Sequence, residues 1–294
     1  MHPVVAEILV SVGKTFAVMG IGVAFRRFWS RDISAVNDLA MQLFVPCLAF
    51  SAILNQELAP HEFGRIAAAA GIVIAGVLIL ALAVFRLTGL RGRGPVIAAV
   101  FANCANLPFP ILEANYGATG LGYGVVYYLV NHLSMFSIGI LLLTRSIDLG
   151  ALLRVPVFVV SLAAILLTAL DVPVPSIIAD TAELLGDAAI PLILFTFGYS
   201  LAGVRLGAWR ATLLVSTLRL AGGLACGLLA VTLLGLDGIQ RDVVILVSAM
   251  PSAVINVVVT GRYRAEPELV ASVVFVTTAA ALVIVPLLLV WLRT

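Results

Sequence analysis

The chain has 294 residues, of which 62% are hydrophobic and 11% are charged, and its mean hydropathy is +1.18. Soluble proteins carry about 25% charged residues, so this composition excludes an ordinary soluble domain. Because a membrane span needs about 20 apolar residues, the length accommodates about ten spans and no sizeable soluble domain. The net charge of +2 and the scattered basic residues give no indication of a nucleic-acid partner.

Apolar segments between charged and turn residues predict ten membrane-spanning helices joined by short connections. The first segment has no basic residue ahead of it and is followed by arginines, which indicates a retained span and not a cleaved signal peptide. The predicted spans are residues 4–25, 33–54, 66–85, 94–115, 118–143, 155–170, 176–202, 210–234, 243–261 and 267–292.

Arginines alternate between the two ends of these spans. The connections after odd-numbered spans carry many more of them than the opposite side, which offers only Arg65, Arg241 and Arg293. By the positive-inside rule, the arginine-rich connections lie in the cytoplasm, and both termini lie on the extracytoplasmic side of the cytoplasmic membrane. The arginines on the predicted cytoplasmic side are Arg26, Arg27, Arg31, Arg86, Arg91, Arg93, Arg145, Arg154, Arg205, Arg210, Arg262 and Arg264.

The two halves of the chain share sequence features at an offset close to half its length. Asp38 stands eight residues before Pro46 in span two, and Glu183 stands eight residues before Pro191 in span seven. Further matches join the ends of spans four and nine at nearly the same offset. The sequence therefore indicates an internal duplication.

A duplicated unit of five spans must enter the membrane from opposite sides in its two copies. We therefore predict an all-α fold of ten transmembrane helices, built as a five-plus-five inverted repeat of residues 1–147 and 148–294. Secondary transporters have this layout, and their binding sites lie near the midplane in broken helices.

Span four contains Pro108 and Pro110, which remove two backbone donors and break the helix. Asn103 and Asn106 precede them and, being three residues apart, are expected to share a helix face. Freed backbone groups persist in hydrocarbon only where protein, water or a ligand satisfies them.

Span nine carries a single proline at mid-depth, Pro251, with Asn256 five residues later. Breaks at equivalent places in both halves predict that spans four and nine cross at mid-membrane, where half-helix N-termini and asparagine amides bind a small anion. The alternative is a pair of proline kinks whose asparagines bond neighbouring helices.

These segments resemble the auxin efflux carrier family, which includes the plant PIN carriers and bacterial malate and malonate carriers. The similarity extends over essentially the whole chain. It rests on Asn103 seven residues before Pro110, Tyr116-Gly117 at the end of span four, Asn131 in span five, and the segment from Ala249-Met250-Pro251 to Asn256.

The resemblance implies a scaffold of spans 1, 2, 6 and 7, a mobile transport domain of spans 3–5 and 8–10, an elevator-like cycle and a homodimer. It also implies that Asn103 is a substrate-contacting amide and that Pro110 and Pro251 are the crossover prolines. Plant members place a carboxylate and a lysine in span three, whereas residues 66–85 contain no charge, so their coupling mechanism does not carry over.

Ionisable residues inside spans are expensive to bury and are therefore functional candidates. Arg219 lies about nine residues into span eight, or ~13 Å from its end. It could clamp carbonyls or pair with another helix, attract the anionic substrate, or snorkel to the interface. Lys14 could form a scaffold ion pair with Asp38 or Glu183, or act in transport.

Two further titratable groups stand near predicted functional segments. Asp187 lies four residues before Pro191, at the expected boundary between scaffold and transport domain, and is the first carboxylate to consider for proton coupling. His132 follows Asn131 and could titrate near neutral pH, although a satisfied core histidine is the favoured interpretation.

No nucleotide-binding loop, metal-ligand spacing or hydrolase motif occurs, so we expect no enzyme activity, cofactor or metal. We predict a secondary transporter of a small organic anion, residing in membrane lipid. The alternative function is a non-transporting membrane sensor or interaction protein on the same scaffold. The expected substrate-binding residues are Asn103, Asn106, Asn131 and Asn256.

Overall fold

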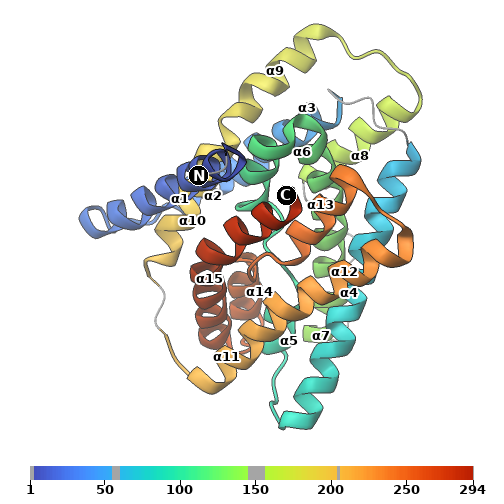
Figure 1. Ribbon diagram of the computed structural model, residues 1–294. Helices are drawn as coiled ribbons and strands as arrows, with labels where there is room; N and C mark the ends of the chain where they lie inside the picture. Colours follow the sequence, from blue (N-terminus) through green and yellow to red (C-terminus); the bar gives the residue numbers. More distant parts are fainter. Residues whose placement is uncertain (1–2, 55–59, 145–155, 204–205, 294) are drawn as a thin grey trace.

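The computed structural model describes residues 3–54, 60–144, 156–203 and 206–293. These residues fold into helices and contain no β-strand (Figure 1). Arg145, Arg154 and Arg205, three of the arginines that suggest the orientation, lie outside the described residues.

The first half of the chain supplies seven of the described α-helices, and each predicted span there falls on one or more of them. Short π-helical turns, Ala40–Phe44 and Met135–Gly139, join α2 to α3 and α6 to α7. The helices are α1 (Pro3–Phe28), α2 (Ser34–Leu39), α3 (Val45–Leu54), α4 (Pro60–Thr88), α5 (Gly94–Val100), α6 (Pro108–Ser134) and α7 (Ile140–Thr144).

The second half supplies the other eight described α-helices, and each predicted span there also falls on one or more of them. A π-helical turn, Leu218–Gly222, joins α11 to α12. The helices are α8 (Pro156–Ala169), α9 (Ser176–Asp187), α10 (Ala189–Leu201), α11 (Trp209–Thr217), α12 (Gly223–Leu234), α13 (Gly238–Ser248), α14 (Ile255–Arg262) and α15 (Pro267–Arg293).

Six helical stretches of the described chain are long and apolar enough to cross a membrane. The protein is therefore an all-helical, multi-pass membrane protein. The six stretches are Ser34–Leu54, His61–Thr88, Pro108–Thr144, Ser176–Leu201, Trp209–Leu234 and Pro267–Arg293, and the apolar helix α8 is shorter.

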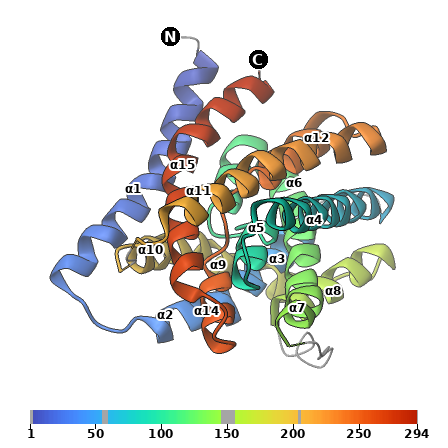
Figure 2. The same cartoon turned by 90° about the horizontal axis from the view of Figure 1, so that it is seen from below.

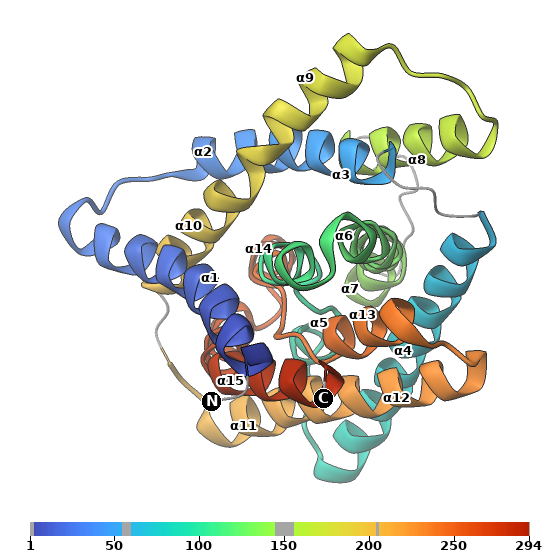
Figure 3. The ribbon, with the colours of Figure 1, turned by 45° about the horizontal axis from the view of Figure 1, so that its top comes forward.

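Helix α6 is a hairpin and not one straight rod. Gly117 has non-helical dihedral angles (φ 62°, ψ −158°) that favour glycine. A Cβ atom added to Gly124 would overlap the side chain of Leu112, whereas twelve residues of straight helix would separate these two positions by about 18 Å. The chain therefore reverses at Gly117, where the sequence predicts the connection between spans four and five, and Figure 3 shows the two arms side by side.

The helices form two groups around this hairpin. Helix α1 packs along α10, and α3 packs against α8 and α9; on the other side, α12 packs against α4 and α13, and α11 against α15. Figure 3 shows α6 and α14 between these two groups. Figure 2 shows that the start of α1 and the end of α15 lie at the same edge of the molecule.

Glycines bring the backbones of α1 and α10 into direct contact. A Cβ atom on Gly198 of α10 would overlap the carbonyl oxygen of Met19, and one on Gly22 of α1 would overlap that of Phe195. Small residues permit this close approach between membrane helices, where van der Waals packing replaces the hydrophobic effect as the driving force.

We expect Gly198→Ala to lower the free energy of unfolding by about 2 kcal/mol, because the added methyl group meets backbone that cannot move aside. The matched control is Gly20→Ala on α1, where a Cβ meets open space and the gain in helix propensity is about 0.5–1 kcal/mol. Thermal unfolding of both variants in detergent measures the difference. Equal melting temperatures for the two variants would contradict the close packing of α1 on α10.

Candidate functional site

Two helices are interrupted near the centre of the molecule. The first break lies between α5 and α6, from Phe101 to Leu107, and the second lies between α13 and α14. The first break is longer than the two prolines alone require, and it includes both Asn103 and Asn106. The expected shared helix face of these two asparagines is therefore not formed, because neither residue is helical.

The two breaks pair with each other through their backbones. Ala102 and Ser252 form an isolated antiparallel β-bridge. The Asn103 N–H donates to the Pro251 carbonyl at 2.7 Å, and the Ala253 N–H donates to the Phe101 carbonyl at 3.2 Å. Each break thus supplies hydrogen-bond partners that the other lost when its helix was interrupted.

Asn256 braces this crossing from α14. Its Nδ2 donates to the Phe101 carbonyl at 2.8 Å and to Ser252 Oγ at 3.0 Å, and its side chain is fully buried. The sequence predicted that Asn256 binds substrate. In the structure it does not line the adjacent cavity, and its Nδ2 donates to protein groups.

Asn131 braces the same crossing from the second arm of α6. Its Nδ2 donates to the Ala102 carbonyl at 3.2 Å, and its side chain also lines the adjacent cavity. A third brace comes from α15, where Thr277 Oγ1 accepts the Ser252 N–H at 3.1 Å.

Arg219 binds the two helix ends that enter the crossing. It lies in the π-helical turn between α11 and α12 and is 1% exposed. Its Nη1 donates to the carbonyls of Ala99 and Val100 at 2.9 and 2.8 Å, and its Nη2 donates to the Ser248 carbonyl at 2.6 Å.

These three carbonyls are the C-terminal, negative ends of the α5 and α13 macrodipoles. The sequence left three roles open for Arg219: a clamp on carbonyls or a pair with another helix, attraction of the substrate, and snorkelling. Its contacts in the structure are those of a carbonyl clamp between two helices. The Arg219 side chain does not line the adjacent cavity.

A cavity of about 320 Å³ lies against the crossing. Asn103 lines it and is 3% exposed; its Oδ1 accepts the Asn106 N–H at 3.0 Å, and its Nδ2 has no hydrogen-bond partner among the described residues. We call this space the crossover cavity. Its polar lining comes from Asn37, Gln42, Asn103, Asn106, Asn131 and His132.

The remaining wall of the crossover cavity is apolar and aromatic. His132 lies between the rings of Tyr128 and Phe136, at centroid distances of 5.0 and 4.8 Å, and Met41 and Met135 complete this side. Among the described residues, no lysine, arginine, aspartate or glutamate lines this cavity.

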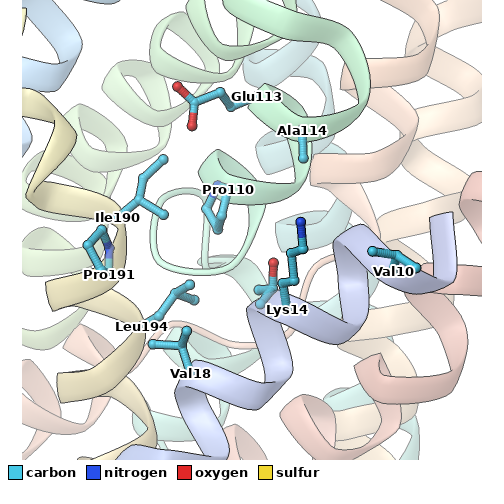
Figure 4. A pocket seen from close by; sticks show the side chains of 10 residues that line it. Val10, Lys14, Val18, Pro110, Glu113, Ala114, Ile190, Pro191 and Leu194 are labelled. Carbon is cyan, nitrogen blue, oxygen red and sulfur yellow. The ribbon is translucent and has the colours of Figure 1, made fainter. Parts of the chain in front are cut away.

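A second cavity, of about 600 Å³, lies between α1, α6 and α10 (Figure 4). It contains Lys14 of α1 and Glu113 of α6, and we call it the Lys14 cavity. Pro110, predicted from the sequence to be a crossover proline, lies in the first turn of α6 and lines this cavity as well. Asp187, the last residue of α9, does not line either cavity but lies close enough to Glu113 for the two carboxylates to repel each other.

The expected ion pair of Lys14 with Asp38 or Glu183 is not formed. The one ion pair within the described ranges joins Arg241 and Asp242. Lys14 instead projects from α1 into the cavity toward α6, as Figure 4 shows. Sequence reasoning missed Glu113, although a carboxylate three residues after a helix-breaking proline inside a span was a usable signal.

The profile of a family described as "Membrane transport protein" matches residues 8–148 and 143–289. The chain belongs to this family, the auxin efflux carrier family. The resemblance seen in its motifs is thereby confirmed, and the protein is a membrane transporter of this family.

Two archaeal proteins, both described as uncharacterized transporters, are similar to this carrier-family member. One, from Methanothermobacter thermautotrophicus, is 29% identical over 95% of this chain and 94% of its own length. The other, from Methanocaldococcus jannaschii, is 23% identical over 69% of this chain and 70% of its own length.

We expect Arg219→Met to lower the free energy of unfolding by at least about 3 kcal/mol, because it leaves three buried carbonyls without donors. Arg219→Lys should recover part of this loss, since an ammonium group can satisfy some of the same carbonyls. Arg262→Met is the control, because Arg262 is exposed and should shift stability by less than about 0.5 kcal/mol. Melting temperatures in detergent report all three, and a stable Arg219→Met protein would refute the clamp.

Proposed function

We propose that the protein is a secondary active transporter of a small organic anion, which binds in the crossover cavity. We propose further that it works by elevator-type alternating access. The observation that carries the proposal is the amide of Asn103. Its Nδ2 is buried, lines a cavity at the crossing of two interrupted helices, and lacks a protein acceptor. An unpaired buried donor in such a place is ready to bind the oxygen of a ligand.

The electrostatics of the crossing favour an anion. The negative C-terminal ends of α5 and α13 are bound by Arg219, whereas α6 and α14 begin at the crossing with their positive N-terminal ends. Val254 and Ile255, at the start of α14, line the crossover cavity together with Asn103. The cavity therefore carries partial positive charge from the start of α14, and no lysine, arginine, aspartate or glutamate of the described chain lines it, which permits an anion to bind and to leave again.

The lining of the cavity favours one carboxylate with an apolar remainder. Amides can pair with one carboxylate, whereas a second carboxylate would face Phe101, Tyr128 and Phe136. A buried charge without a partner is costly, so a monocarboxylate should bind more tightly than a dicarboxylate of similar size. Asn103 and Asn106 are the proposed ligand contacts, with Asn131 beside them and Asn256 as their support.

We propose the ten-span inverted repeat as the underlying architecture. It is supported by the position of the two breaks, which occur at equivalent places in residues 1–147 and 148–294 and pair antiparallel to each other. In this scheme α1–α3 and α8–α10 form the scaffold, and α4–α7 and α11–α15 form the transport domain. Their packing into two groups agrees with this division.

Alternating access requires openings on both sides of the crossing. The crossover cavity involves Asn37 and Pro156, near the starts of α2 and α8, and the Lys14 cavity involves Glu113, in α6 beyond the first break. With both termini outside, the first would face the cytoplasm and the second the exterior. A homodimer and proton coupling through Asp187 remain proposals that follow from the resemblance and from the place of Asp187 at the α9–α10 junction.

Flux measurements separate a transporter from a membrane sensor on the same scaffold. Purified protein in proteoliposomes should accumulate at least one labelled carboxylate from a panel of aliphatic and aromatic mono- and dicarboxylates, under an imposed pH or sodium gradient. Monocarboxylates should be preferred. Saturable binding of a carboxylate without flux of any member of the panel would favour the sensor.

Asn103→Ala should weaken binding of the best-transported carboxylate by about 10- to 100-fold, the loss expected for one hydrogen bond to a charged ligand. Asn115→Ala is the matched control, because Asn115 is an amide of α6, the helix that follows the break, and lines neither cavity. Equilibrium binding to both purified variants gives the comparison, and their melting temperatures establish that both are folded. An unchanged dissociation constant for Asn103→Ala would show that the Asn103 amide does not contact the ligand.

A further inference from the structure

The Lys14 cavity combines three features that the proposed transport of an anion through the crossover cavity does not use. They are a lysine in the middle of α1, the helix of the predicted first span, a carboxylate on a facing helix, and apolar walls between them. The cavity volume of about 600 Å³ lies within the range of ligand-binding pockets.

Lys14 lacks a partner in the described part of the chain. It lies about 16 Å along α1 from Pro3 and about 21 Å from Phe28, so its side chain reaches neither end of the helix. Neither a hydrogen bond nor an ion pair joins it to any of the described residues, and its side chain is exposed to the cavity. Intramembrane cations that face a cavity and lack a protein partner mark ligand pathways.

The opposite side of the Lys14 cavity is negative. Glu113 projects into it from α6, and Asp187 lies within electrostatic range of Glu113. In Figure 4 the Lys14 ammonium group points toward α6, whereas the Glu113 carboxylate points toward the side of α10. The two charges are thus separated across the cavity and leave room for a ligand between them.

The space between these charges is bounded by apolar side chains. Val10 and Val18 come from α1, and Ile190, Pro191 and Leu194 come from α10. A ligand there must therefore present a compact apolar group to the walls as well as charge to the two ends.

We propose that the Lys14 cavity binds a small zwitterion with an apolar body, such as an amino acid with an aliphatic side chain. The carboxylate of the ligand pairs with Lys14, its ammonium group pairs with Glu113, and its side chain packs on the apolar walls. A simple anion would be repelled by Glu113 and Asp187, and a simple cation would be repelled by Lys14. This site is distinct from the crossover cavity, and its existence does not depend on the transport of an organic anion.

Three probes with one apolar body test the charge requirement on the unmodified protein. They are leucine, 4-methylpentanoate, which lacks the amino group, and 3-methylbutylamine, which lacks the carboxylate. Equilibrium binding to the purified protein in a non-ionic detergent should give an affinity for leucine about tenfold or more above that for either single-charge probe. No leucine binding, or equal binding of a single-charge probe, would overturn the proposal.

Variants locate the site. Lys14→Met and Glu113→Gln should each weaken leucine binding by about tenfold or more, and Lys14→Arg should retain most of it. Arg262→Met and Glu268→Gln are charge-matched controls outside the cavity and should bind leucine as the unmodified protein does. A loss of affinity in the controls as large as that in Lys14→Met and Glu113→Gln would overturn the assignment to this cavity.

Discussion

The clamp of Arg219 on three backbone carbonyls is the interaction on which the rest of the site depends. Interrupting a helix inside a membrane leaves carbonyls without donors, at a cost of several kcal/mol each. Arg219 supplies donors to the carbonyls of two helices at once. This is possible because α5 and α13 end side by side and one guanidinium carries enough donors to bind both ends. A charge that is expensive to bury is thus balanced by the negative ends of two helix dipoles.

This arrangement makes the crossing electrically asymmetric. The C-terminal ends are neutralised by a buried cation, and the N-terminal end of α14 is left to face the crossover cavity. Several backbone groups of the two breaks bind each other or are bound by Asn131, Asn256 and Thr277. Asn103 Nδ2 is buried without a hydrogen-bond partner among the described residues, and unlike Asn256 and Arg219 its residue lines the crossover cavity, where a ligand can accept its hydrogen bond.

The sequence predicted the helices well, because long apolar segments bounded by charges have few alternatives in a membrane. It also predicted that spans four and nine break, since proline removes a backbone donor wherever it stands. It could not predict how far the first break extends, because that depends on the partners offered by the second break, about 150 residues away in the chain. The roles of the asparagines depended on the same pairing: Asn256 supports the backbone, whereas Asn103 keeps a donor for the cavity.

The charged residues show the same limit of sequence reasoning. Arg219 and Lys14 are both deep in predicted spans, yet Arg219 donates to three backbone carbonyls whereas Lys14 faces an open cavity. Hydropathy identifies both as exceptional but cannot distinguish them, because the difference lies in which helices pack against each. The sequence marks Glu113 as a carboxylate inside a span, but its place opposite α1 and α10 depends on how α6 packs in the folded chain.

The most direct test of the central claim is an experimental structure of the protein in lipid nanodiscs, determined with a saturating concentration of the best-transported carboxylate. The account predicts ligand density in the crossover cavity, with a carboxylate oxygen within hydrogen-bond distance of Asn103 Nδ2 and with the Arg219 contacts to Ala99, Val100 and Ser248 intact. Ligand density elsewhere, with Asn103 paired to a protein group, would contradict it.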